Sequence, residues 1–144
     1  MDSRVDSANG SPTCTHIAIH ARDVDRSVEF YTRYADLVEV HRRKDDSTTV
    51  VWLGEPGHER DFVLVLLGMP HQDAVNPGPI AHIGYAVDSP EIVDRIGALA
   101  DAAGILLKQP HNAGPIVGYF CIIEDPDGNW IEFSHGQSLG RGAG

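Results

Sequence analysis

The chain has 144 residues, enough for one domain with a sizeable core. Its net charge is −10 at pH 7, which argues against a nucleic acid or an anionic membrane as a partner, since both require a basic face. The longest apolar run, 62–67, is far too short to span a membrane, and the polar N-terminus has no signal-peptide core. Two cysteines distant in sequence form no disulfide framework. We expect a cytoplasmic protein.

The first half of the chain alternates strands with one helix. His16, Ala18 and His20 fall on one face of a strand, because strand side chains alternate. Asp23 offers an N-cap for a helix with an apolar stripe. The predicted elements are strands at 14–21, 37–42, 48–53 and 61–67, with the helix after the first strand.

The second half repeats this order after a Pro/Gly-rich linker at 70–79. Ser89 is an N-cap followed by Pro90 at the first helical position, and Gly104 suits the end of that helix. The predicted elements are a strand at 80–87, the helix, and strands at 105–108, 117–124 and 129–134, with a loop at 109–115.

An internal repeat is the most informative feature of the chain. The segment 15–18 (THIA) matches 81–84 (AHIG), and each half reads βαβββ. The fold class is therefore α+β, with two βαβββ modules (14–69 and 80–136) in a curled, incompletely closed mixed sheet with helices outside. Residues 1–13 and 137–144 are expected to be flexible tails. Packing about a pseudo-twofold axis would bring His16 and His82 close together.

The segment 125–133 (DPDGNWIEF) predicts a turn inside the last β-hairpin. It also puts Glu132 in an apolar strand, where a buried carboxylate is costly unless something pairs it. Two histidines and one carboxylate suit a divalent metal such as Fe, Mn, Ni, Co or Zn, with positions left for water or substrate. Singly, a strand histidine is more often structural, but the repeat relates His16 to His82.

The chain resembles the vicinal-oxygen-chelate superfamily, which includes glyoxalase I, extradiol dioxygenases and bleomycin-resistance proteins. The resemblance rests on the two strand histidines, the segment 23–31 (DVDRSVEFY), and the DPDGN turn with Glu132 four residues past its Gly. It implies that His16, His82 and Glu132 are metal ligands. It also implies a homodimer, and it leaves open whether the residues around one metal come from one chain or from two.

One departure concerns the fourth ligand of glyoxalase I, a Glu in the last strand of the first module. Val65 stands at that position, and no acidic residue follows Asp61 in the strand. The resemblance therefore argues against glyoxalase I proper. By residue type and the family's second-sphere pattern, His20, His111 and Tyr119 are candidates for moving a proton.

Three functions stay open for a protein that binds a small-molecule substrate. The first is a glyoxalase-like lyase or isomerase that holds its substrate through two adjacent oxygens. The second is an extradiol-type Fe(II) dioxygenase. The third is a metal-free protein that sequesters a drug or a metabolite.

Overall fold

The computed structural model describes residues 14–59, 61–68 and 82–137. The predicted linker, the predicted N-terminal tail and all but the first residue of the C-terminal tail lie outside these residues. The elements are β1 (His16–Ala21), α1 (Val24–Ala35), β2 (Val38–Asp45), β3 (Thr48–Gly54), β4 (Val63–Gly68), β5 (Ile83–Ala86), α2 (Pro90–Ala102), β6 (Leu106–Asn112), β7 (Tyr119–Glu124) and β8 (Trp130–His135).

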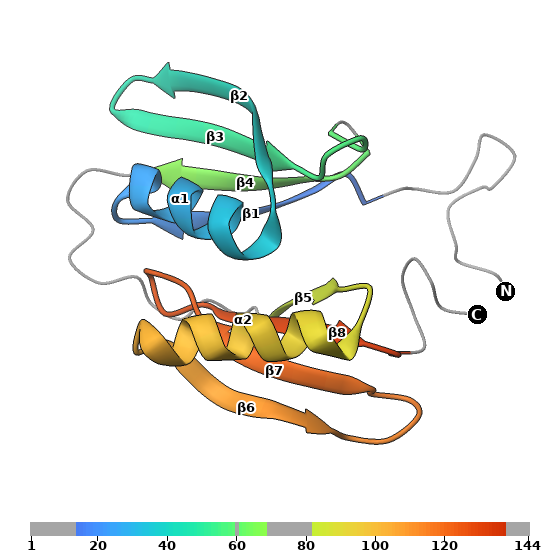
Figure 1. The fold of residues 1–144 in the computed structure, drawn as a ribbon. Coiled ribbons are helices and arrows are strands. Elements are labelled where there is room, and N and C mark those ends of the chain that lie inside the picture. Colours follow the sequence, from blue (N-terminus) through green and yellow to red (C-terminus); the bar gives the residue numbers. More distant parts are fainter. Residues whose placement is uncertain (1–13, 60, 69–81, 138–144) are drawn as a thin grey trace, which may run out of the picture.

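Each half of the chain folds as the predicted βαβββ module (Figure 1). Sheet one has the strand order β1-β4-β3-β2, and sheet two has the order β5-β8-β7-β6. In each sheet the first two strands in this order pair in parallel and the others pair antiparallel. The structure thus confirms the α+β class and shows two open mixed sheets, not a closed barrel.

Both helices begin at the predicted caps. The Asp23 carboxylate accepts a hydrogen bond from the Arg26 N–H (3.2 Å), and the Ser89 hydroxyl accepts one from the Ile92 N–H (3.3 Å). Gly104 follows α2 with a φ of 74°, the left-handed conformation expected at this position. Neither helix in the described residues is long and apolar enough to cross a membrane.

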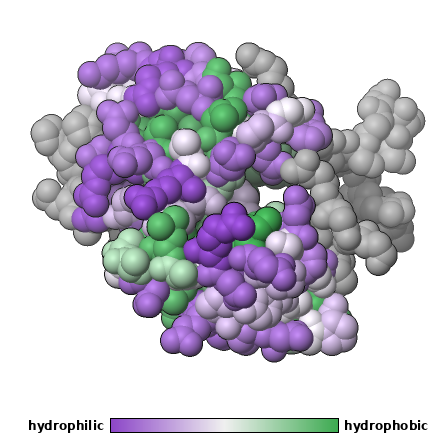
Figure 2. Space-filling view, viewed as in Figure 1, coloured by the Kyte–Doolittle hydropathy of each residue, from purple (hydrophilic) through white to green (hydrophobic). Residues whose placement is uncertain are grey.

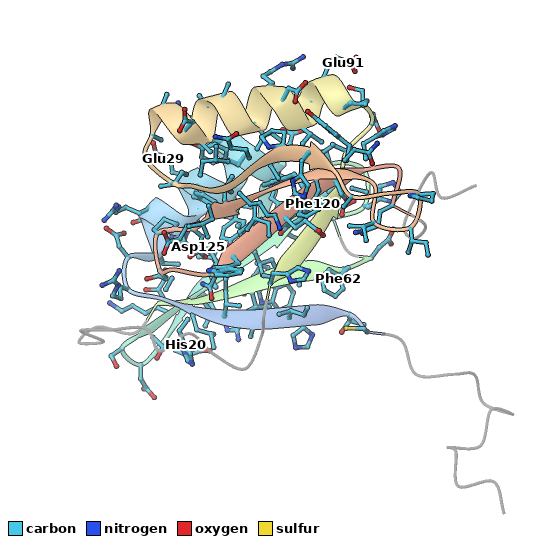
Figure 3. The ribbon with its side chains drawn as sticks, turned by 90° about the horizontal axis from the view of Figure 1, so that it is seen from below. His20, Glu29, Phe62, Glu91, Phe120 and Asp125 are labelled. Carbon is cyan, nitrogen blue, oxygen red and sulfur yellow. The ribbon has the colours of Figure 1, made fainter. Side chains whose placement is uncertain are left out.

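One core joins the two modules. Each helix packs on one face of its own sheet. The opposite face of each sheet, which neither helix covers, is called its open face. Figure 3 shows Glu29 and Glu91 on the outer sides of the helices, away from this core. The fully buried side chains come from both modules and include Tyr31, Leu53, Leu66, Val93, Ile123, Ile131 and Phe133.

The prediction of a loop at 109–115 is wrong in its first half, because β6 continues to Asn112. β6 is the edge strand of sheet two, where Pro110 can lack an N–H without breaking a central ladder. Its pairing with β7 shifts register between Lys108 and His111. Pro110 also packs on Gly97 of α2, where a Cβ would stand 2.7 Å from the Pro110 Cγ. This packing against a helix distant in sequence outweighs the local loop signal.

The predicted DPDG turn forms, with Gly128 at φ 87° and its N–H donating to the Asp125 carbonyl (3.1 Å). Residues of module one hold this turn by hydrogen bonds to its two buried carboxylates, those of Asp125 and Asp127. The Tyr31 hydroxyl donates to Asp125 (2.6 Å). Asp127 accepts bonds from the Arg22 N–H, the Arg22 guanidinium and the Ser27 hydroxyl, at 3.0–3.2 Å. The end of β1 is thereby tied to the start of β8.

Candidate functional site

Glu132 lies on the open face of sheet two, opposite the face that α2 covers. Glu132 is buried, with only 8% of its surface exposed. Among the described residues its carboxylate has one ionisable neighbour within 4 Å, the His82 Nε2 at 3.9 Å from Oε2, and no hydrogen bond. A buried carboxylate without a hydrogen bond is costly. A carboxyl group in this environment is stabilised by binding a cation or a proton.

The pair formed by His82 and Glu132 fits a divalent metal. Ligand atoms at about 2.0–2.2 Å from one metal can be up to roughly 4.4 Å apart, so 3.9 Å is within reach. Gly84 pairs with Glu132 across β5 and β8, and a Cβ there would stand 3.1 Å from Oε2. The absent side chain at Gly84 therefore leaves room for the carboxylate.

His16 lies on the open face of sheet one. The Thr15 hydroxyl contacts the His16 Nδ1 at 3.0 Å, which leaves Nε2 for another partner, as in metal-binding histidines. Within the described part of one chain, however, no group of three His, Cys, Asp or Glu side chains could hold a metal. The structure thus brings His82 and Glu132 together and leaves His16 outside their group.

A cavity of about 470 Å³ opens on the face of sheet one that carries His16. Val65 is part of its wall, so the position aligned with the fourth ligand of glyoxalase I is apolar here. Most of the wall is apolar, with a few polar groups, as in small-molecule sites. The lining residues are Thr15, His16, Ala18, Arg43, Val50, Trp52, Glu59, Val63, Val65 and Leu67.

The three candidates for moving a proton lie in different places. His111 packs at a tilt against Phe120 (ring centroids 4.5 Å apart, planes at 57°), and Phe120 shares the open face of sheet two with Glu132. Tyr119 lies on the opposite face of β7, where its hydroxyl donates to Asp94 of α2. His20 is exposed at the end of β1 and is far from Phe120 in Figure 3.

A second cleft, of about 760 Å³, lies between the modules. The face of the molecule seen in Figure 2 is largely hydrophilic and has an opening between the two modules. Tyr85 lines the cleft, and its pKa is raised first by burial and then by the charges of Glu55 and Asp125. None of the six predicted site residues lines this cleft, so the candidate site stays on the open faces of the sheets.

Sequence reasoning missed Arg43, Trp52 and Gly84. Alternation along 48–53 puts Trp52 on one face with Val50, but it does not say that this face borders a cavity. The match between THIA and AHIG contains Gly84 without explaining it. His135 at the end of β8 is half-buried, and its Nδ1 contacts the Val87 carbonyl at 3.1 Å.

The sequence of the chain is similar to those of known proteins. Residues 13–133 match the model of the Glyoxalase/Bleomycin resistance protein/Dioxygenase superfamily. An uncharacterized protein of Pseudomonas aeruginosa is 39% identical over 92% of this chain and 95% of its own length. A probable chloroplastic lactoylglutathione lyase of Arabidopsis thaliana is 27% identical over 81% of this chain and 34% of its own length.

The fold is also similar to solved structures. The trypanothione-dependent glyoxalase I of Leishmania major superposes with a TM-score of 0.72, covering 88% of each chain at 22% identity. This similarity concerns the fold. The match over 13–133 covers nearly all of the described chain, including both strand histidines and Glu132. The chain therefore belongs to the glyoxalase/bleomycin resistance protein/dioxygenase superfamily, the vicinal-oxygen-chelate superfamily.

Proposed function

We propose that this protein is a metal-dependent lyase or isomerase that binds a small substrate through two adjacent oxygens. The observation that carries the proposal is Glu132, a buried carboxylate that faces the His82 Nε2 at 3.9 Å and has no hydrogen bond among the described residues. The third ligand in the proposal is His16. A divalent metal held there would supply Lewis-acid stabilisation of negative charge that develops on the substrate oxygens.

The proposal places His16 of one subunit against His82 and Glu132 of the partner subunit. Three observations support it. The three side chains do not form one group in the described part of a single chain, and each lies on the open face of its sheet. Trp130 shares the face of Glu132 and is 51% exposed, so it offers a large apolar side chain to a partner subunit or a ligand on that face.

His111 is the proton-moving group that the geometry favours. Its Nδ1 contacts the Gln109 carbonyl at 3.0 Å, and only a protonated nitrogen can donate to a carbonyl. The Nε2 of the neutral ring is then an acceptor on the face of Glu132. Tyr119 is less suited to this role, because its hydroxyl is engaged by Asp94.

Metal content tests the proposal directly. Protein purified without added metal is analysed for Fe, Mn, Ni, Co and Zn, alongside the variants His82→Ala and His58→Ala. His58 is the matched control, since it is an exposed histidine paired with Asp61 at 2.9 Å. We expect metal in the wild type and in His58→Ala and a loss in His82→Ala. The same metal content in all three proteins would refute the proposal.

A metal-free binding protein is the second candidate. It is favoured by the mostly apolar cavity of about 470 Å³, which could enclose a ligand without any metal. Under this alternative His82→Ala would leave both the metal content and ligand binding unchanged.

Iron in the wild type would instead call for an oxygen-uptake assay with catechols, because uptake would indicate an extradiol dioxygenase.

A further inference from the structure

We propose that the cavity on sheet one takes an elongated anion, with an apolar body across Trp52 and Val65 and a carboxylate held by Arg43. The inference rests on the proposed function, in which the opposite end of this ligand meets the metal at His16.

The strand register places His16 and Arg43 at opposite corners of the cavity. His16 of β1 pairs with Val63 of β4. Arg43 of β2 pairs with Val50 of β3, Val50 pairs with Leu67 of β4, and Leu67 pairs with His20 of β1, four residues after His16. The two corners are therefore three strand spacings and four residues apart, about 20 Å between Cα atoms on a flat sheet. Because both side chains line the same cavity and reach inward, a ligand joining them is on the order of 10 Å long.

Arg43 has free capacity for an anion. Its Nε donates to Asp45 at 2.9 Å, and its other N–H donors have no hydrogen bond among the described residues. The guanidinium lies 5.9 Å from the centre of the Trp52 ring, which holds it beside the cavity. A planar fork of N–H donors binds a carboxylate through two parallel hydrogen bonds.

Glu59 fixes the direction of the ligand. The backbone of Glu59 lies within 2.7–2.8 Å of where a Gly54 Cβ would be, and Gly54 pairs with Val63 beside His16. The Gly57 N–H donates to the Glu59 carboxylate (3.0 Å), and this bond lowers the pKa of the carboxyl group. A negative charge therefore stands at the His16 end of the cavity, so the carboxylate of a ligand belongs at the Arg43 end.

The test compares 4-phenylbutyrate with 4-phenylbutyramide, which share their shape and differ in charge. Isothermal titration calorimetry measures both affinities on the protein with its two tryptophans intact. The protein is first dialysed against a chelator, so that the result does not depend on the metal and is separable from a failure of the proposed function.

We expect the acid to bind at least about tenfold more tightly than the amide. Arg43→Gln should remove this preference, and Arg43→Lys should restore part of it. The control is Arg42→Gln, because Arg42 pairs with Asp25 and Glu39 on the helix side of the same strand and should not affect the preference. Equal affinities for acid and amide, binding of neither probe, or the same loss in Arg42→Gln would overturn the inference.

Discussion

The surroundings of the Glu132 carboxylate are set partly by its own strand and partly by the neighbouring strand. Its place in an apolar strand is visible in the sequence, and so is the need for a partner. The sequence does not show that Gly84, across the neighbouring strand, leaves the room that its carboxylate occupies. Such a close approach depends on the pairing of β5 with β8, which joins residues far apart in the chain.

Gly84→Ala is expected to weaken metal binding without lowering the stability of the fold. The added Cβ would stand 3.1 Å from the Glu132 Oε2 and displace the carboxylate. Replacing a strand Gly by Ala should raise stability by roughly 0.5–1 kcal/mol, while displacing a ligand should lower metal affinity by about tenfold or more. Urea unfolding and metal titration measure the two effects. Ala86→Ser, on the same face, is the control and should retain wild-type metal affinity.

The two cysteines should differ sharply in reactivity. Cys121 is fully buried, and burial, followed by the charges of Asp94 and Glu132, raises its pKa to about 11. Only about one Cys121 thiol in 10⁴ is then a thiolate near neutral pH, whereas Cys14 is exposed. A water-soluble thiol reagent should label Cys14 alone in native protein and both residues in denaturant. Rapid native labelling of Cys121 would contradict its buried position.

At the scale of elements, the DPDG turn does more than reverse the chain. Asp125 and Asp127 are buried and accept hydrogen bonds from Tyr31, Arg22 and Ser27, all in module one. A turn that the sequence identifies by its local chemistry is therefore also a contact between modules. It fixes the start of β8, the strand that carries Glu132.

Tyr31→Phe measures the strength of this contact. The change keeps the packed ring and removes the hydroxyl that donates to Asp125 at 2.6 Å, a bond to a charged group. We expect a loss of about 1.5–3 kcal/mol in the free energy of unfolding. Tyr34→Phe is the matched control, since the Tyr34 hydroxyl has no hydrogen bond among the described residues, and it should cost below about 0.5 kcal/mol. Similar losses in both variants would mean that the bond contributes little.

Most elements could be predicted, because their signals are local. The caps at Asp23 and Ser89, the apolar stripes and the DPDG turn all lie within a few residues of the structure they specify. β6 could not be predicted beyond residue 108, because its extension depends on Pro110 packing against Gly97 of α2. The inward face of β7 was also undecidable, since both of its faces carry apolar residues.

For the whole molecule, the repeat in the sequence predicted two related modules, and they form. What it could not specify is how the open faces of the two sheets are used. The placement of His16 on one open face, and of His82 and Glu132 on the other, depends on the packing of both modules around one core. The proposal that two chains complete each metal site follows from this placement.

Complementation between two inactive variants tests that proposal most directly. A heterodimer of His16→Ala with His82→Ala, purified through two different tags, contains one site with all three ligands if each site is shared between subunits. We predict that neither variant alone binds metal, and that the heterodimer recovers about half of the wild-type metal per chain. A heterodimer as metal-free as its parents, or a wild-type protein that is monomeric by light scattering, would contradict the shared site.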